Sequence, residues 1–424
     1  MMNRKTFLKY LAASSTAMVL GHKASQASAS VTVIPPTGLS GMDTGSWAAV
    51  RELFPLSPKR IYFNTGGLGP TSNPVLEAMH QQALRQAIDG EHHHSLLHRV
   101  RETTAGIFGA HPDEIAFVRN ATEGNSVIAN GLDLKAGDEV IFESHAHPGG
   151  SFPWLARQKE IGIKVRIFEP DPDSPEENLQ RILSLVNDRT KVIQVSHVTA
   201  PTGILFDVMS IARACRERGI WFHIDGAQSA GMIPFNLNAI ACDSYATSGH
   251  KWLNGPQESG FLYIAKSRLD EVACSHAGAY SSGQYKLPDT FVYAPFAHRH
   301  EYGTRDAASI LGLETALRLQ QKIGLERIAK HGKKLVAEAR LVLGNIDGVK
   351  ILTPGHPDMH NSILSFRIAG KESGDLYRRL LEEHNLRCRN VTERGINAIR
   401  ISWHVYNSEA DLESLEKAVR SLVS

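Results

Sequence analysis

The sequence has little of several features that would narrow its function at once. It has only 4 cysteines in 424 residues, and none stands at the paired spacing of a metal site. Positive and negative side chains nearly balance, 46 against 44, and no arginine-rich stripe occurs, which disfavours a nucleic-acid partner. No repeat or low-complexity tract is present, and beyond residue 30 no apolar run approaches the roughly 20 residues that span a membrane. We expect a globular chain of one large or two ordinary domains, with buried thiols, although the count also allows two disulfides.

Residues 1–29 have the composition of an export signal. A basic start precedes a mildly apolar centre at residues 10–20 and a small-residue triplet, Ala-Ser-Ala, at residues 27–29. The stretch that begins at Arg4 and Lys5 resembles a twin-arginine signal whose second arginine is replaced by lysine. Sec export and a plain N-terminal arm stay open as alternatives. We predict a periplasmic protein that has no membrane segment once the signal is removed.

Behind this signal, apolar runs alternate with helical periods. Residues 207–220 have apolar side chains at helical spacing between two strand-like runs, which indicates a βαβ unit and hence a parallel sheet. We therefore predict an α/β fold with a mostly parallel sheet. Its strands are expected at residues 114–120, 139–144, 191–199, 221–228 and 260–265.

The C-terminal part changes character. Helical periodicity dominates residues 308–344, and shorter strands are expected at residues 362–368 and 398–406. We predict an N-terminal segment over residues 30–75, a large domain over residues 76–305 and a smaller α+β domain over residues 306–424.

Three groups at the ends of predicted strands carry chemistry. In "RNATEG", a strand turns into a helix at Asn120, so free backbone amides would face an anion such as phosphate. Asp225 ends the strand in "HIDGAQ", where a cap or turn role is the alternative. Lys251 lies in "SYATSGHKWLNGP", where a solvated lysine is the alternative. A phosphate cradle, a carboxylate and an amine together fit pyridoxal phosphate (PLP), because the amine condenses with its aldehyde and the carboxylate keeps its pyridine nitrogen protonated.

Six segments also carry a family resemblance: "YFNTGGLGP", "RNATEG", "WFHIDGAQSAGMIPFNL", "SYATSGHKWLNGP", "EYGTRD" and "AIRISWHVYNSEADLESL". In them the chain resembles the fold type I, class V aminotransferases, a group that includes cysteine desulfurases and isopenicillin N epimerase-like enzymes. The resemblance implies a PLP enzyme in which Lys251 binds the cofactor, Asp225 pairs with the ring nitrogen and Gln228 contacts the ring oxygen.

The same resemblance implies the remaining contacts. The phosphate would be held by Ala121, Thr122, Ser248 and His250, with Thr304 reaching in from a second subunit of a homodimer. The substrate carboxylate would be held by Arg400, beside Asn64 and Gly66.

The chain departs from the family in two places. The ring-stacking histidine should fall in "FESHAHPGGSFPW", where both His145 and His147 are candidates. Desulfurases of the family carry a nucleophilic cysteine on a loop that reads "NVTERGINA" here, without one. Cys388 lies nearby in the predicted strand "NLRCRN", where a buried structural thiol is expected. Cysteine desulfuration is therefore disfavoured, and "GTRD" favours the epimerase-like branch.

A histidine-rich stretch, "GEHHHSLLHRVRE", places His94 and His98 four residues apart on an expected helix. That spacing can bind zinc, but no acidic or cysteine ligand stands at metal-site spacing. We expect no metal, and cleft or surface histidines instead.

The sequence thus predicts an exported PLP enzyme with transaminase-like chemistry. Its substrate would be a small amine next to a carboxylate, or an amino-acid side chain of a peptide-like molecule. Among exported relatives, the chain resembles the periplasmic enzyme that tailors the glutamate side chain of pyoverdine siderophores. An epimerase or a C–S lyase is the alternative. A non-catalytic binding protein is disfavoured, because such a protein needs neither Lys251 nor Asp225.

Overall fold

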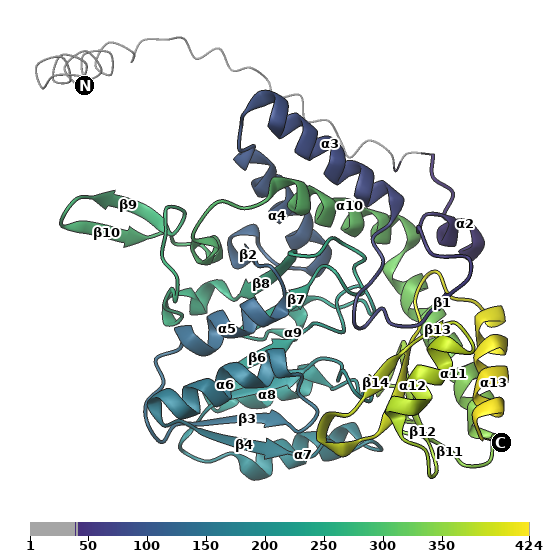
Figure 1. The fold of residues 1–424 in the computed structure, drawn as a ribbon. Coiled ribbons are helices and arrows are strands. Elements are labelled where there is room, and N and C mark those ends of the chain that lie inside the picture. The colour runs from purple at the N-terminus through teal and green to yellow at the C-terminus, as the bar shows by residue number, and fades with distance from the viewer. Residues whose placement is uncertain (1–38, 40, 424) are drawn as a thin grey trace, which may run out of the picture. The chain divides into compact units, whose positions relative to one another are not determined.

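A computed structural model describes residue 39 and residues 41–423 of the chain (Figure 1). The predicted export signal at residues 1–29 lies outside the described residues. Within the described part, no helix combines the length and the apolar character needed to cross a bilayer.

The large sheet has seven strands in the order β2-β8-β7-β6-β5-β3-β4. Strands β4, β3, β5, β6 and β7 run parallel, whereas β8 is antiparallel to both of its neighbours. The predicted α/β class is therefore confirmed. Edge strand β4 was not predicted, because it carries Lys164 and Arg166 and buries only Phe168. The bounds are β2 (Ile115–Phe117), β3 (Glu139–Glu143), β4 (Lys164–Phe168), β5 (Thr190–Ser196), β6 (Trp221–Asp225), β7 (Ser244–Ser248) and β8 (Gly260–Ile264).

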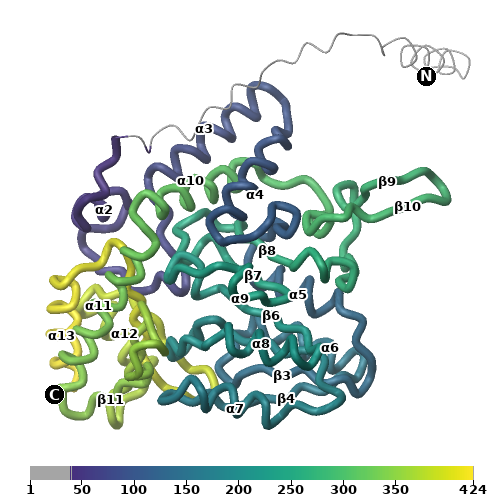
Figure 2. The backbone as a smooth tube through the Cα atoms, turned by 180° about the vertical axis from the view of Figure 1, so that it is seen from behind, coloured from purple at the N-terminus to yellow at the C-terminus, as the bar shows by residue number. Residues whose placement is uncertain are grey.

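Helices cover both faces of this sheet (Figures 1 and 2). Along β3, Val140 and Phe142 join one apolar cluster, whereas Ile141 between them joins another, as the period of a strand buried on both faces requires. The first cluster lies under α5 (Ala121–Gly131) and α6 (Pro148–Ile161). The second lies under α4 (His94–Phe108), α7 (Pro175–Leu185), α8 (Val208–Glu217) and α9 (Leu237–Ile240).

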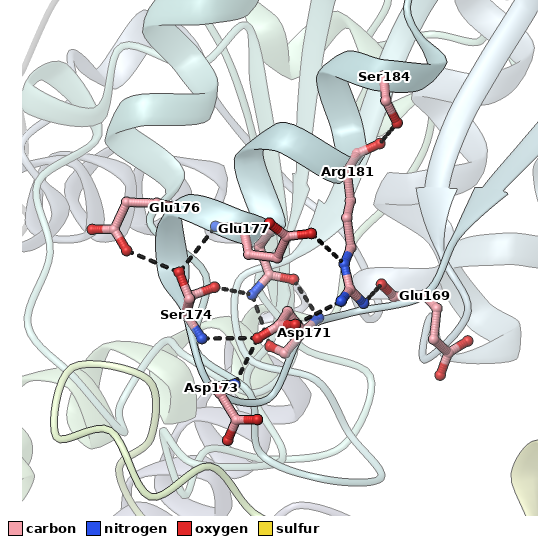
Figure 3. A network of polar contacts seen from close by, with 9 residues as sticks. Glu169, Asp171, Asp173, Ser174, Glu176, Glu177, Arg181 and Ser184 are labelled. Carbon is pink, nitrogen blue, oxygen red and sulfur yellow. Dashed lines mark hydrogen bonds and ion pairs between the residues drawn. The ribbon is translucent and has the colours of Figure 1, made fainter.

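The connection from β4 to α7 is fixed by a polar network (Figure 3). Ser174 is the N-cap of α7, and its Oγ accepts the Glu177 N–H at 3.1 Å. Asp171 accepts the Ser174 N–H at 2.9 Å and pairs with Arg181 at 2.6 Å. Such a cap satisfies amides that the first helical turn leaves open, so the helix begins at a defined residue.

Helix α10 (Ala307–Ile323) lies just past the predicted domain boundary at residue 306. It nevertheless packs on α3 (Asn73–Asp89) and α4, and its Leu313 and Leu317 belong to the core of the large sheet. The helical region predicted over residues 308–344 is in fact two helices, because Gly324 with φ 99° separates α10 from α11 (Leu325–Gly344). Of these two helices, only α11 joins the apolar core of the C-terminal sheet, through Leu335, Val336, Ala339 and Leu343.

The smaller unit is an antiparallel sheet with helices packed on it. Its strand order is β11-β12-β15-β14, and α11, α12 (Ser373–Glu382) and α13 (Glu409–Val423) share its apolar core. The α+β character predicted for this region agrees with this arrangement. The strands are β11 (Val349–Ile351), β12 (Ile363–Ile368), β14 (Arg389–Val391) and β15 (Ala398–Ser402).

The N-terminal segment joins both units. After α2 (Trp47–Glu52), strand β1 (Ile61–Tyr62) pairs with β13 (Leu386–Arg387), and Asn64 forms a bridge to Ser402 of β15. A separate hairpin of β9 (Ser282–Lys286) and β10 (Thr290–Tyr293) extends from the body (Figure 1). The short 3-10 helices are η1 (Pro112–Glu114), η2 (Lys266–Glu271), η3 (Ala297–Glu301) and η4 (Glu393–Gly395).

All four cysteines are free. Cys215, Cys242 and Cys388 are buried, whereas Cys274 is partly exposed. Burial raises the pKa of Cys215 and of Cys388 to about 12, so neither thiol ionises near neutral pH.

Candidate active site

A cavity of about 310 Å³ lies where β6 and β7 end, at the carboxyl edge of the parallel strands. Small-domain strands β14 and β15 contribute Arg389 and Arg400 to its lining. Three of the predicted site residues, Asn64, His145 and Thr304, do not line it. Those that do are Gly66, Ala121, Thr122, His147, Asp225, Gln228, Ser248, His250, Lys251 and Arg400.

Lys251 follows β7 on a tight turn and is partly buried. Burial lowers the pKa of its amine to about 8, against the opposing effect of Asp225. The glycine-rich loop packs directly on this turn, since the Gly69 N–H donates to the His250 carbonyl at 2.7 Å. A Cβ at residue 69 would lie 1.9 Å from the Lys251 carbonyl oxygen, so only glycine fits there.

Asp225 ends β6, and a chain of buried donors holds its carboxylate. Asn125 Nδ2 donates to Asp225 Oδ2 at 3.1 Å, and the Ala227 N–H donates to Oδ1 at 3.0 Å. Asn125 uses its amide nitrogen on Asp225 and on the Gly149 carbonyl, so its Oδ1 must accept the N–H of His223 Nε2 at 2.8 Å. Burial lowers the pKa of His223 to about 3 and keeps this ring neutral. The carboxylate thus accepts a hydrogen bond on each oxygen, which fixes its orientation at the end of β6.

The other imidazole nitrogen of His223 completes this chain. Its Nδ1 lies 2.8 Å from Ser244 Oγ, which accepts the Trp221 Nε1–H at 2.9 Å. Because Ser244 Oγ accepts from Trp221, its own hydroxyl hydrogen is free to donate to His223 Nδ1. Each donor in the chain from Trp221 to Asp225 therefore has one acceptor. Sequence reasoning missed Asn125, because only the packing of α5 against β6 brings its side chain beside Asp225.

The N-terminus of α5 forms a second side of the cavity. Asn120 caps the helix by accepting the Glu123 N–H at 3.0 Å, and the Ala121 N–H donates to Ser248 Oγ at 3.0 Å. Gly149 packs closely on Thr122, because a Cβ at residue 149 would lie 2.3 Å from Thr122 Oγ1. Nδ1 of His250 is buried without a hydrogen-bond partner among the described residues. A helix N-terminus beside an unpartnered imidazole suits an anion such as phosphate.

Gln228 is held in a single orientation. Its Oε1 accepts the Trp252 Nε1–H at 2.7 Å, and its Nε2 donates to the Gly66 carbonyl at 2.9 Å. Trp252 Nε1 can only donate and a carbonyl can only accept, so the two ends of the amide cannot exchange. One Nε2 hydrogen stays available to an acceptor in the cavity.

His147, and not His145, lines the cavity. His147 is the N-cap of α6, and its Nδ1 accepts the Gly149 N–H at 3.0 Å. Burial, reinforced by Lys251, lowers its pKa. His145 instead contacts Thr202 Oγ1 at 3.0 Å and Glu169 at 3.6 Å. Of the two histidines that the sequence leaves open, His147 is therefore the one placed to contact a ring in this cavity.

Arg400 is almost fully buried on β15. Its Nη1 donates to the Ala200 carbonyl at 2.9 Å, and its Nη2 donates to Asn64 Oδ1 at 3.2 Å. Burial, followed by the effect of Arg389, lowers its pKa to about 9. Asn64 therefore contacts the arginine and not the cavity. Arg389 was not predicted, because its place opposite Arg400 depends on strand register.

The remaining candidates lie apart from the cavity. Thr304 is exposed in this single chain, so a role across an interface stays a prediction. His94 contacts Tyr280 Oη at 2.8 Å, and His98 lies near Glu102 at 3.7 Å with 72% of its side chain exposed. Over residues 41–423 no group of three or more His, Cys, Asp or Glu side chains is placed to hold a metal ion.

This donor set fits PLP. Lys251 offers an amine that can lose its proton near pH 8, Asp225 offers a carboxylate for the ring nitrogen, and His250 keeps an unpartnered nitrogen beside the α5 N-terminus. Gln228 offers one amide hydrogen for the ring oxygen, and Thr122 and Ser248 lie at the phosphate side. Arg400 offers a guanidinium to a carboxylate of the substrate.

The chain resembles several known proteins along most of its length. The model of the family described as "Aminotransferase class-V" matches residues 62–415. A probable cysteine desulfurase of Methanothermobacter thermautotrophicus is 29% identical over 88% of this chain and 97% of its own. An isopenicillin N epimerase of Streptomyces clavuligerus is 28% identical over 90% and 99%. The structure of a C-DES variant with glycine covalently linked to its PLP cofactor superposes with a TM-score of 0.80, at 25% identity over 87% of this chain and 98% of that one.

Proposed function

Since the chain belongs to the class V aminotransferase family and is a PLP-dependent enzyme of fold type I, we propose that it acts on the amino group of a substrate with an adjacent carboxylate. One observation carries the proposal. Arg400, buried and without an ion-pair partner among the described residues, lines the same cavity as Lys251 and Asp225. A buried guanidinium in a small-molecule cavity is best satisfied by a carboxylate.

Each side chain then has a stated task. When bound, PLP supplies an electron sink for the carbon next to the substrate amine. Lys251 holds the cofactor and then moves a proton at that carbon, which its pKa near 8 permits at neutral pH. Asp225 keeps the ring nitrogen protonated. Arg400 fixes the substrate carboxylate and thereby decides which bond is presented for cleavage.

We propose that the reaction is transaminase-like. Its setting would be the tailoring of a siderophore side chain, such as the glutamate of pyoverdine. Epimerisation is the second candidate, favoured by the similarity to an isopenicillin N epimerase. Desulfuration is disfavoured in spite of the desulfurase relatives. No cysteine lines the cavity formed by the described residues, and Cys388 is buried.

Incubation of the holoenzyme with candidate amines separates these reactions. For transamination we expect the cofactor absorbance to shift to that of pyridoxamine phosphate, with one 2-oxo acid formed per active site in the absence of an acceptor. Chiral chromatography of the recovered amino acid provides the control for epimerisation. An inverted α-carbon without oxo acid would contradict transamination and support the second candidate.

We also propose export to the periplasm by a twin-arginine-like route. Replacing Arg4 and Lys5 together by Gln should leave active holoenzyme in the cytoplasm, because that route carries folded, cofactor-loaded proteins and depends on the basic pair. Fractionation with N-terminal sequencing measures the outcome, and the unaltered chain should begin near Ser30. Intact Met1 on cytoplasmic wild-type enzyme would contradict export without touching the PLP assignment.

A homodimer is the assembly that we propose, with Thr304 reaching the phosphate of the neighbouring subunit. The exposure of Thr304 in the single chain supports it. Sedimentation of the holoenzyme at falling concentration should show cofactor release together with dissociation, and a monomer that keeps all of its PLP would contradict it.

A further inference from the structure

Hydrogen-bond donors from three separate segments hold the turn that carries Lys251. The glycine-rich loop contributes the Gly69 N–H, and α10 contributes Gln320 Nε2, which donates to the Trp252 carbonyl. The third donor is His404, which is buried and follows the end of β15. The position of the turn therefore depends on contacts with distant parts of the chain.

His404 contacts this turn at two points. Its Nε2 lies 2.9 Å from the Trp252 carbonyl oxygen and 2.7 Å from Asn254 Oδ1. A carbonyl can only accept, so the ring hydrogen is on Nε2. Asn254 is oriented to match, because its Nδ2 donates to the Pro70 carbonyl at 3.1 Å and leaves Oδ1 as the acceptor. Burial lowers the pKa of His404 to about 3, so at neutral pH the ring is an uncharged donor.

The same segment carries Arg400, four residues before His404. Both side chains contact loops at the carboxyl edge of the large sheet, Arg400 at the Ala200 carbonyl and His404 at the lysine turn. Between them, the N–H groups of Ser402 and Trp403 donate to the carbonyls of neighbouring segments at 2.8 Å each, which holds the intervening backbone in place. One short, fixed segment therefore connects the lysine turn to the guanidinium of Arg400.

The separation of these two groups matters for a substrate whose amine and carboxylate are joined by a single carbon. The groups that bind its two ends must keep a fixed distance, because a small misplacement of reacting atoms costs a large factor in rate. We infer that His404 is a positioning residue, which fixes the Lys251 turn relative to Arg400 and so lets one small substrate engage both. The inference rests on the proposed function and names the residue that sets its selectivity for amines with an adjacent carboxylate.

Two small reagents report this spacing. Aminooxyacetate has a nucleophilic nitrogen and a carboxylate, whereas methoxyamine has the same nitrogen and no carboxylate. In each reaction the reagent nitrogen forms the double bond to the aldehyde carbon of PLP, the bond from that carbon to Lys251 breaks, and the two hydrogens of the reagent nitrogen pass to the lysine amine. The exchange needs no oxidant or reductant, and the absorbance of the holoenzyme follows its rate.

Stopped-flow absorbance of the holoenzyme with the two reagents tests the inference. Wild type should react about tenfold faster with aminooxyacetate, since one charge-assisted contact is at stake. His404→Leu leaves the Trp252 carbonyl with its donor Gln320, so the variant should fold and bind PLP while the preference falls about tenfold, close to one. His404→Gln places an amide donor near the position of Nε2 and should restore the preference. His404→Asn, whose amide is one carbon shorter, should lose the preference and replaces His404→Leu if that variant fails to fold.

A variant of another buried histidine separates positioning from stability. His360 does not line the cavity, and its Nδ1 donates to the His356 carbonyl at 2.9 Å. His360→Leu should lower the melting temperature of the holoenzyme and keep the wild-type preference. An unchanged preference in His404→Leu and His404→Asn, an equal loss of both rates, or a loss of preference in His360→Leu would overturn the inference alone. A wild type without preference for aminooxyacetate would contradict the proposed function, and the inference with it.

Discussion

Lys251→Ala is expected to abolish covalent attachment of the cofactor and to lower turnover by about 10²–10⁴-fold, the usual contribution of a positioned proton-transfer group. The physical reason is that no second lysine lines the cavity described here. The β7 turn itself should survive, because its contacts run through backbone atoms such as the His250 carbonyl.

Visible absorbance of the purified variant and steady-state turnover measure this prediction. Lys266→Ala provides the matched control, since Lys266 is exposed and pairs with Asp113 at 3.0 Å. The control should keep the absorbance and activity of wild type. A Lys251 variant that kept them would refute the assignment.

The lowered pKa of Lys251 adds a pH dependence to the same prediction. Only the neutral amine attacks an aldehyde, and this fraction grows as pH rises through about 8. Reloading of the apoenzyme with PLP should therefore accelerate up to about that pH and then level off. A rate that kept rising toward the ordinary pKa of lysine would show that burial does not act on this amine.

Asp225→Asn is expected to keep PLP bound while turnover falls by roughly 10–200-fold, the factor that corresponds to one hydrogen bond to a charged group. The amide cannot stabilise a protonated ring nitrogen as a carboxylate does. It also places donor hydrogens toward Asn125 or the Ala227 N–H, which themselves donate.

Turnover and PLP content of this variant are measured side by side. Asp207→Asn serves as the control, because Asp207 caps α8 and does not line the cavity, and asparagine caps a helix equally well. Wild-type turnover in Asp225→Asn would refute the role of the carboxylate.

Part of the candidate site could be predicted from local sequence pattern. Asp225, Ser248 and Lys251 sit where buried strands end, and parallel strands bring such ends to one edge, so their meeting follows from local pattern. The helix break at Gly324 could not be predicted, because apolar periodicity continues on both sides of it. Edge strand β4 could not be predicted either, because Lys164 and Arg166 interrupt its apolar pattern and only Phe168 is buried.

Other features depend on contacts between distant segments. Arg389 enters the cavity only because β14 pairs with β15 in one particular register. The choice between His145 and His147 depends on which residue caps α6, and both residues stand within the same short loop. Asn125 reaches Asp225 across 100 residues. Such long-range geometry is absent from any single stretch of sequence.

The most direct test of the central claim is to treat wild-type holoenzyme with borohydride and to map the modified peptide by mass spectrometry. Borohydride reduces the link between a lysine and the cofactor to a stable amine, so the attachment site can be read from the peptide mass. We predict one reduced phosphopyridoxyl group per chain, on Lys251. A modification on another lysine, or a chain that binds PLP without any covalent link, would contradict the account.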